Sequence, residues 1–368
     1  MVKCANCGRE YGPISKFLGI CRNCILHNFQ SVKSRIQKVH QISREAFTLP
    51  PLPPQDKAGV SCNYCFNQCQ IGQGAVGYCG VRENRQGKKL NPPPKEGFFS
   101  WYYDPLPTNC VADWVCPGGT GAGFPRYAYS KGPEYGYKNL AVFYHGCTFN
   151  CLFCQNWHYR ESLRGKKPQT SLELSQAVDG MTSCICYFGG DPSPQLLHSI
   201  HTSRLAKAHK HRKILRVCWE TNGTMNSRFL EEILDIALES GGCVKFDLKT
   251  FHSNMNIALC GRSNYQTKVN FELAAKWIKK REDPPLVVAS TLLVPGYIER
   301  EEVYQIARFV ASLNPDIPYS LLGFYPHFYF RDLPPTSRLH AKECEEAALE
   351  AGLKKVRIGN IHLLGKDY

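Results

Sequence analysis

Residues 144–158 read Tyr-His-Gly-Cys-Thr-Phe-Asn-Cys-Leu-Phe-Cys-Gln-Asn-Trp-His and carry a C-x3-C-x2-C array, Cys147, Cys151 and Cys154. An apolar run, 140–144, precedes the array and predicts a strand. Three thiolates on a short loop can hold three corners of a cubane iron–sulfur cluster, and no fourth cysteine follows closely. One iron would then stay open for chemistry. The same spacing suits zinc or a group of buried thiols, so the array alone does not decide its metal.

The composition predicts a globular protein, because 43% of the 368 residues are hydrophobic. No apolar run approaches the length of a membrane span and the chain opens without an apolar signal segment, so we expect a cytoplasmic location and no membrane partner. Nineteen cysteines, many in C-x2-C pairs, indicate metal ligands rather than disulfides. The formal net charge of +14 favours an anionic partner such as RNA or an acidic protein face, although thiolate ligands would offset part of it.

Two further cysteine sets precede the array. The first comprises Cys4, Cys7, Cys21 and Cys24. Two C-x2-C pairs suit a tetrahedral zinc ribbon, and a rubredoxin-type iron site needs the same spacing. The second set comprises Cys62, Cys65, Cys69 and Cys79. Zinc or an auxiliary iron–sulfur cluster would both fit this glycine-rich loop, and the sequence leaves that choice open.

The chain divides into four predicted regions. They are a zinc-ribbon-like arm with a helix (1–46), a proline-rich linker (47–61), the second cysteine set with a connector (62–138) and a core domain (139–368). Apolar residues at three- and four-residue steps predict the arm's helix, and the prolines that follow cannot continue it. In the connector, Cys110 and Cys116 are either spare thiols or half of a further site.

The core domain alternates strands and helices. The predicted strands are 140–145, 184–189, 214–220, 243–249, 286–293 and 319–324. The predicted helices are 171–182, 194–210, 226–240, 265–281, 299–313 and 337–351. Six such repeats predict a parallel α/β barrel or partial barrel. Ligands of such barrels bind at the carboxyl ends of the strands, so the motifs found there are candidate site residues.

Two glycine-containing loops follow the second and third predicted strands. In Gly189-Gly190-Asp191 the glycines permit close backbone approach, and Asp191 can accept a hydrogen bond from an ammonium group. The alternative is a turn that caps the next helix. In Glu220-Thr221-Asn222-Gly223 a carboxylate and an amide could hold ribose hydroxyls or a carboxylate, and a bare turn is the alternative.

Two more motifs follow the fourth and fifth predicted strands. Asp247 and Lys249 stand two residues apart on a strand and therefore point to the same face. Either they belong to a ligand pocket or they form an ordinary salt bridge. The run 292–296, which contains Pro295, follows the fifth strand.

Several of these motifs together resemble one family. They are the cysteine loop that ends Gly80-Val-Arg-Glu-Asn84, the dipeptides Asp104-Pro105 and Pro117-Gly118, and the array that ends Gln155-Asn156-Trp157. They resemble the branch of radical S-adenosylmethionine (SAM) enzymes that includes pyruvate formate-lyase activating enzymes and AmmeMemoRadiSam system proteins. The resemblance covers about residues 60–362 and leaves the ribbon as an addition.

The resemblance implies a (β/α)6 partial barrel and a [4Fe–4S] cluster on the three cysteines of the array. In this family the open iron chelates SAM, and an electron from the cluster cleaves SAM to methionine and a 5′-deoxyadenosyl radical. The positions that the resemblance assigns to SAM binding are Phe153, Gly189, Gly190, Asp191, Glu220, Asn222, Asp247, Lys249 and Pro295. Many relatives carry Glu where this chain has Asp191.

We therefore expect a radical SAM enzyme, an oxidoreductase similar to the activating enzymes, with a [4Fe–4S] cluster, SAM and Zn²⁺ as cofactors. The resemblance implies a ferredoxin- or flavodoxin-type reductant and, as the leading substrate, a glycyl-radical enzyme. A second hypothesis is modification of RNA or a ribosome-associated protein, with the basic charge and the ribbon as a docking arm. A third is a non-catalytic electron carrier or zinc-dependent interaction protein, which would need no ammonium-binding loop.

Overall fold

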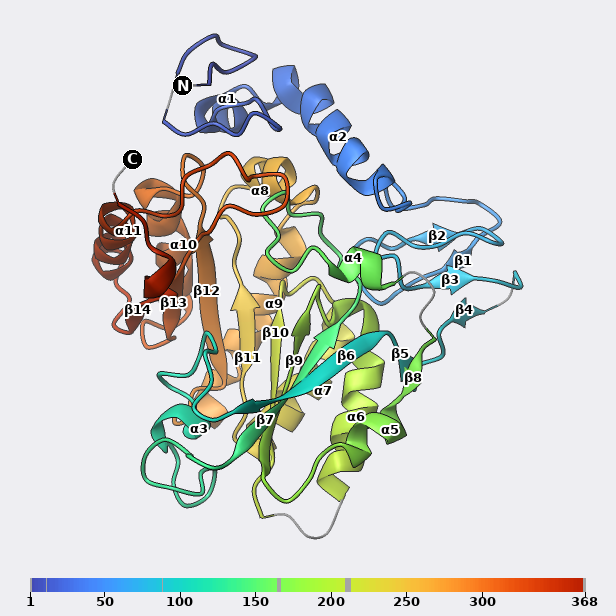
Figure 1. Ribbon diagram of the computed structural model, residues 1–368, viewed down its shortest axis with the longest axis vertical. Coiled ribbons are helices and arrows are strands. Elements are labelled where there is room, and N and C mark those ends of the chain that lie inside the picture. Colours follow the sequence, from blue (N-terminus) through green and yellow to red (C-terminus); the bar gives the residue numbers. More distant parts are fainter. Residues whose placement is uncertain (1, 11, 88, 164–166, 209–212, 367–368) are drawn as a thin grey trace.

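The computed structural model describes residues 2–10, 12–87, 89–163, 167–208 and 213–366. One eight-stranded sheet forms its centre, with the order β14-β13-β12-β11-β10-β9-β7-β6 (Figure 1). These strands are β6 (Phe99–Pro105), β7 (Lys138–Tyr144), β9 (Thr182–Gly189), β10 (Arg216–Thr221), β11 (Val244–Asp247), β12 (Val287–Leu293), β13 (Tyr319–Gly323) and β14 (Val356–Gly359). Only β6 runs antiparallel to its neighbour, and the other strands pair in parallel.

The helices alternate with these strands, as the sequence predicts. They are α5 (Ser171–Gln176), α6 (Leu196–Ala208), α7 (Ser227–Ser240), α8 (Ser253–Cys260), α9 (Tyr265–Ala275), α10 (Arg300–Leu313) and α11 (Arg338–Glu350). Each of the six predicted strands and six predicted helices has a counterpart in the structure. The mixed α/β fold with a parallel sheet is confirmed.

Three elements of the central domain were not predicted, and two helices are shorter than expected. Strands β6 and β14 lie at the two edges of the sheet, and α8 has only eight residues. The predicted helix 171–182 ends at Gln176 because an Asp179-Gly180 turn leads into β9. The predicted helix 265–281 ends at Ala275 and is followed by a separate 3-10 turn, Ile278–Lys280.

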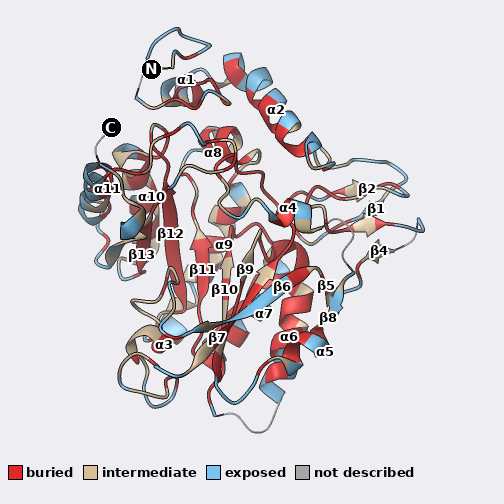
Figure 2. Cartoon of the chain, viewed as in Figure 1, coloured by how far each residue is buried: buried red, intermediate tan, exposed pale blue. Residues whose placement is uncertain are grey.

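The core lies between the sheet and the helices. Every residue of β12 is buried, as expected for a parallel strand covered on both faces (Figure 2). Exposed residues lie on the outward sides of helices such as α11. Within the described ranges, no helix is both long and apolar enough to cross a membrane.

Short elements precede the central domain. They are the helices α1 (Arg22–His27) and α2 (Phe29–Glu45) and the two-residue strands β1 (Val60–Ser61), β2 (Gln70–Ile71), β3 (Glu83–Asn84), β4 (Leu90–Asn91) and β5 (Glu96–Gly97). The proline-rich run 49–54 is irregular, and the role of residues 47–61 as a linker stays a prediction. The remaining short elements are α3 (Pro117–Thr120), α4 (Tyr159–Ser162), β8 (Gln169–Thr170) and the 3-10 turns Ser193–Gln195 and Ile361–Leu363.

The N-terminal arm, residues 2–46 as described, packs onto the end of the sheet where the parallel strands finish (Figure 1). The Tyr297 hydroxyl accepts a hydrogen bond from the Ser15 amide at 3.2 Å and donates one to the Ile20 carbonyl at 3.1 Å. The Phe17 ring stacks on Tyr329 with a centroid distance of 4.1 Å. The arm therefore covers the loops after β12 and β13.

Candidate active site

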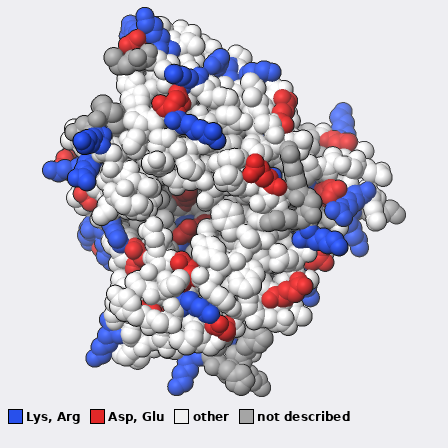
Figure 3. Space-filling view, in the orientation of Figure 1, with Lys and Arg blue, Asp and Glu red and all other residues white. Residues whose placement is uncertain are grey.

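A cavity of about 350 Å³ lies at the carboxyl ends of the parallel strands. Its wall includes residues from the loop after β7 and from β9 through β14, so nearly every strand of the sheet contributes to it. Figure 3 shows a hollow near the middle of the viewed face, with acidic and basic side chains inside it. This is the edge at which parallel α/β barrels bind their ligands.

All three cysteines of the array line this cavity. Cys147 and Cys151 are buried, and Cys154 is partly buried. Their loop is fixed by backbone hydrogen bonds to the end of α8, from the Asn150 amide to the Cys260 carbonyl at 2.8 Å and from Leu152 to Leu259 at 3.0 Å. Helix α8 therefore holds the cysteine loop against the cavity, although its own sequence gave no indication of that role.

The surroundings of these thiols fit an iron–sulfur cluster better than a single ion. The ligands of one tetrahedral zinc lie about 3.8 Å apart, because each Zn–S bond is about 2.3 Å. Among the described residues, only the N-terminal cysteines form so compact a group. Burial raises the pKa of Cys147 and of Cys154, so thiolates at these positions need a cationic partner. Several iron atoms between more widely spaced thiolates would supply it.

The loop after β9 needs its two glycines. Gly189 has a φ of +122°, and a Cβ there would lie 2.5 Å from the Tyr144 backbone. A Cβ on Gly190 would lie 2.3 Å from the Gly146 carbonyl oxygen. Both residues line the cavity and let this loop pack directly against the loop that carries Cys147. The close backbone approach expected from the sequence is what the structure has.

Asp191 connects the two glycine-containing loops. Its buried carboxylate accepts from the Thr221 hydroxyl at 2.8 Å and from the Asn222 amide at 3.0 Å. The Asn222 side chain then donates to the Thr148 hydroxyl at 2.8 Å and lies 3.8 Å from the Cys147 sulfur. Asp191 thus accepts from protein donors, and its contact with an ammonium group stays a prediction.

Three charged side chains at the ends of β10 and β11 also face the cavity, namely Glu220, Asp247 and Lys249. Asp247 pairs with Lys249 through one oxygen, and its other oxygen is buried without a partner among the described residues. Phe153, another predicted position, is 3% exposed, and its ring lies 5.9 Å from the Lys249 ammonium. The cavity therefore combines a flat apolar wall with one unsatisfied carboxylate oxygen.

The structure gathers eight of the nine predicted SAM-binding positions around this cavity. Pro295 is the exception, because it is buried and is not among the residues that line the cavity. The next residue, Gly296, faces the N-terminal arm, and a Cβ there would lie 1.8 Å from the Pro13 carbonyl oxygen. The arm contacts this loop at Gly296, and the contact of Pro295 with SAM stays a prediction.

Other lining residues were not predicted. They include Asn109, Asp113, Arg160, Ser290, Ser320, Arg357 and Asn360. Arg357 pairs with Asp113 at 2.7 Å, and these residues are 244 positions apart in the chain. No local pattern could reveal such a pair. Arg160 stands six residues after Cys154, and its basic character beside the array was the one available signal.

A second cavity of about 130 Å³ lies inside the sheet next to the first. Six thiols line it, those of Cys110, Cys116, Cys184, Cys186, Cys218 and Cys243. The buried Lys245 ammonium lies between the two cavities and contacts Cys110 at 3.0 Å, Cys186 at 3.1 Å and Glu220 at 2.7 Å. Cys110 and Cys116, which the sequence left unassigned, therefore belong to the wall of this inner cavity.

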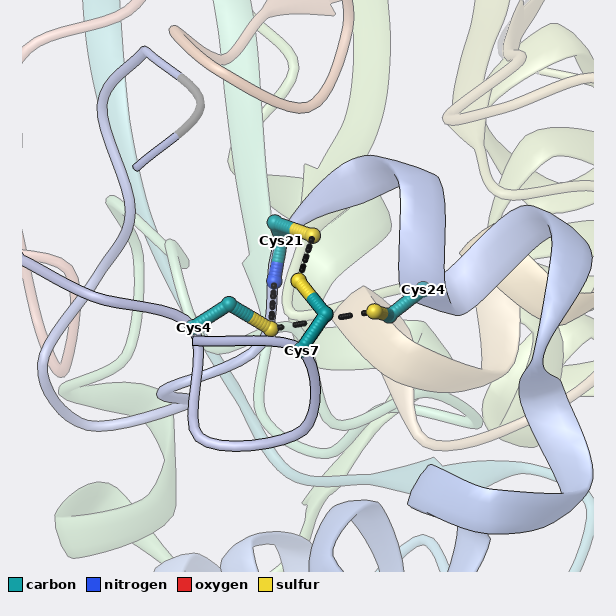
Figure 4. Close-up of side chains that lie close together, drawn as sticks. All are labelled: Cys4, Cys7, Cys21 and Cys24. Carbon is teal, nitrogen blue, oxygen red and sulfur yellow. Dashed lines mark hydrogen bonds between the residues drawn. The ribbon is translucent and has the colours of Figure 1, made fainter. Parts of the chain in front are cut away.

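The four N-terminal cysteines converge as a tetrahedral site requires (Figure 4). Their sulfur atoms all lie within 4.8 Å of one another, with 3.8 Å between Cys4 and Cys24 and 4.0 Å between Cys7 and Cys21. Burial raises the pKa of Cys4, but hydrogen bonds from the backbone amides of Cys21, Cys7 and Asn6 lower it to about 6. This set could bind a metal ion, and zinc as that ion is a prediction.

The second cysteine set is buried but does not form so compact a group among the described residues. Burial raises the pKa of Cys62 to about 12 and that of Cys69 to about 11. Two hydrogen bonds place the set beside the active-site loops. The Phe66 amide donates to the Thr224 carbonyl at 3.1 Å, and the Asn67 side chain donates to the Thr148 carbonyl at 3.0 Å. Zinc and an auxiliary iron–sulfur cluster both stay predictions for this set.

Sequence comparisons identify the central domain. The profile of the radical SAM superfamily matches residues 141–310. MJ0808 of Methanocaldococcus jannaschii, an uncharacterized protein, is 24% identical over 329 residues, which is 83% of each chain. MJ1632 of the same organism, provisionally named a glycyl-radical enzyme activating enzyme, is 26% identical over 189 residues, which is 50% of this chain and 67% of MJ1632.

Two solved structures are similar at a lower level. SuiB of Streptococcus suis bound to S-adenosylmethionine has a TM-score of 0.42 and 14% identity, over 59% of this chain and 49% of SuiB, so the chain spans about half of SuiB's length. A domain of pyruvate-formate lyase-activating enzyme from Bacteroides vulgatus has a TM-score of 0.37 and 20% identity, over 48% of this chain and 98% of that domain. At these TM-scores we draw no conclusion from either structure. Residues 141–310 thus match the radical SAM superfamily, and the chain is similar in sequence to a protein provisionally named a glycyl-radical enzyme activating enzyme.

Proposed function

We propose that this protein is an enzyme that cleaves SAM reductively at a [4Fe–4S] cluster held by Cys147, Cys151 and Cys154. The observation that carries the proposal is the meeting of these cysteines with the Gly189-Gly190 loop around one cavity at the strand ends. When bound, the cluster and SAM would supply a 5′-deoxyadenosyl radical that abstracts a hydrogen atom from a substrate. The residues of the chain bind, orient and shield these groups.

The protein's contribution is mostly positional. The Gly189-Gly190 backbone leaves room beside the cysteine loop, and a side chain at either position would fill that room. The unpartnered oxygen of Asp247 can accept a hydrogen bond from a hydroxyl or ammonium group of SAM. Phe153 offers an apolar face on which an adenine ring can stack. A plain electron carrier would need neither the glycine loop nor the unsatisfied carboxylate.

We propose that the substrate is a glycyl-radical enzyme. The name of the relative MJ1632 describes it as activating an enzyme of this kind. The reductant would be a ferredoxin- or flavodoxin-type protein. The experiment is incubation of the reduced protein and SAM with a glycyl-radical enzyme from the same organism. A glycyl radical detected by electron paramagnetic resonance supports the substrate. Formation of 5′-deoxyadenosine without that radical, at the same rate with and without the partner, contradicts the substrate and leaves the SAM chemistry intact.

The SAM chemistry has its own test. Anaerobic reconstitution with iron and sulfide, followed by SAM and dithionite, should yield 5′-deoxyadenosine, and Cys151→Ala should abolish that yield. The matched control is Cys344→Ala, which removes a buried thiol on α11, away from the cavity-lining residues. Zinc bound at the three cysteines, or a cluster whose spectrum does not respond to SAM, would overturn the proposal.

A further inference from the structure

Arg160 is a buried cation directly beside the cysteine array. It lies on α4, is 1% exposed and lines the 350 Å³ cavity. One guanidinium nitrogen, Nη2, donates to the Asn150 side chain at 3.3 Å. The other two nitrogens, Nε and Nη1, are buried and have no hydrogen-bond partner among the described residues. A buried hydrogen-bond donor without an acceptor destabilises the folded state, so we expect a group in the complete protein to accept hydrogen bonds from these nitrogens.

The other buried arginines of the described chain differ from Arg160. Arg216 pairs with the Glu134 carboxylate at 2.6 Å. Arg44, Arg82 and Arg281 donate to backbone carbonyls, which include those of Pro50, Pro194 and Pro284. Arg160 has no such carboxylate partner among the described residues. Among the described arginines, Arg160 has two buried nitrogens without a hydrogen-bond partner, whereas Arg22 has one, its Nε.

Aromatic rings and thiols surround the Arg160 guanidinium. Aromatic rings hold the guanidinium carbon, at 4.5 Å from the Tyr159 centroid and 4.7 Å from that of Phe328. Burial alone would lower the pKa of Arg160, but the neighbouring Tyr159, Cys154 and Cys147 raise it. The groups that favour its charge thus include two of the three thiols expected to hold the cluster.

We propose that Arg160 is a positioning residue that donates hydrogen bonds to the cluster assembly near Cys154 and raises its reduction potential. The inference rests on the proposed function, because it requires a [4Fe–4S] cluster on this array. Sulfide and thiolate sulfurs carry negative charge and accept hydrogen bonds, and a buried site screens that charge poorly. They would give the two unsatisfied nitrogens the partners they lack.

The direction of the effect follows from charge. One electron from an external donor, dithionite or a ferredoxin-type protein, changes the cluster from the 2+ to the 1+ state and makes the assembly more negative by one charge. A fixed cation nearby stabilises the reduced state more than the oxidised state. Arg160 therefore favours uptake of the electron that SAM cleavage needs.

The test is a potentiometric titration of the reconstituted protein without SAM, followed by electron paramagnetic resonance of the reduced cluster before and after SAM is added. We compare Arg160→Met and Arg160→Gln, which remove the charge, with Arg160→Lys, which keeps it. The matched control is Arg308→Gln, the same change at an exposed position of α10. We expect about a tenfold lower equilibrium constant for reduction in the neutral variants, which corresponds to about 59 mV for one electron. Lysine should restore part of the difference, and the control should match the unmodified protein.

Each outcome decides the inference. Equal midpoint potentials in a neutral variant and the unmodified protein, at equal iron and sulfide content, would overturn it. Unchanged potentials with a weaker spectral response to SAM would also overturn it and assign Arg160 to SAM. If one neutral variant fails to retain iron, the other suffices, since replacing a buried charge by an apolar side chain is often well tolerated. A failure of the unmodified protein to assemble any cluster would refute the proposed function instead.

Discussion

The N-terminal cysteine set and the active-site array use the same residue type for different purposes. In the arm, four sulfurs lie within 4.8 Å of one another, a spacing that suits a single metal ion. In the central domain, three cysteines line a 350 Å³ cavity together with glycines, carboxylates and an aromatic ring. A closed tetrahedral site stabilises a fold, whereas an incomplete set of ligands beside a cavity leaves a position open for chemistry. The number of ligands and the space around them separate the two roles.

The two regions are nevertheless connected. Helix α2 of the arm places His40 between the Ala258 carbonyl at 3.0 Å and the Asn150 side chain at 2.9 Å. Asn150 directly precedes Cys151 and also accepts from Arg160. The arm is therefore attached to the same loop that carries the active-site cysteines, and damage to one region can be measured in the other.

The largest effect is expected when the cysteines of one region are replaced, because that region alone should then lose its metal. Replacing Cys147, Cys151 and Cys154 together by serine should remove about four iron atoms per chain and leave the arm's metal in place. Replacing Cys4 and Cys24 by serine should remove one ion and leave the cluster. Elemental analysis of both variants measures this. Loss of both metals from either variant would contradict the separation of the two sites.

The next effect concerns the arm alone. Cys24→Ser should release the arm from the central domain, because a structural metal site and the fold around it form together. Limited proteolysis should then cleave residues 12–46 at least ten times faster, roughly as expected when local structure is lost. Cys344→Ala serves as the control, since that thiol is buried on α11. An arm that resists protease without its metal would show that packing onto Tyr297 and Tyr329 is sufficient.

A smaller effect is expected when a side chain is added in the Gly189-Gly190 loop, which packs more tightly than an ordinary turn. Gly190→Ala places a Cβ 2.3 Å from the Gly146 carbonyl oxygen, so the two loops must move apart. We expect a destabilisation of about 2–3 kcal/mol and at least a tenfold weaker SAM affinity, roughly as for other strained core changes. Thermal unfolding and SAM titration measure both. Gly180→Ala is the matched control, because a Cβ there meets nothing within 4 Å. Equal SAM affinity in the two variants would refute a role for close packing at Gly190.

The smallest effect tests the connection between the regions. Burial lowers the pKa of His40 from 6.5 to about 4, so the unfolded chain binds the proton more readily. The stability from neutral His40 is complete above pH 6.5 and disappears as the pH falls to about 4. Between pH 7 and pH 5 we expect a loss of about 2 kcal/mol that His40→Gln does not share. Unfolding of both proteins at both pH values measures this difference. Parallel losses in the two proteins would exclude His40 as the cause.

Much of the site followed from local sequence. Strand ends are recognisable by apolar runs, and residues at those ends converge because parallel strands finish at one edge. This is why Gly189, Asn222 and Lys249 were predicted together and line one cavity. Strand β14 was missed because four residues at a sheet edge carry too little pattern. The partners of Arg357 and Gly296 were missed because they come from the connector and the arm, far away in the chain.

The sequence by itself determined the cysteine spacings, the strand and helix alternation and the glycines that permit close packing, because each depends on neighbours within a few residues. Only the tertiary structure decided that the arm packs onto the array's loop, that six thiols surround an inner cavity and that Arg160 is buried with two donors unsatisfied. Burial and long-range partners arise when distant segments pack together, and the pattern within any one segment does not specify them.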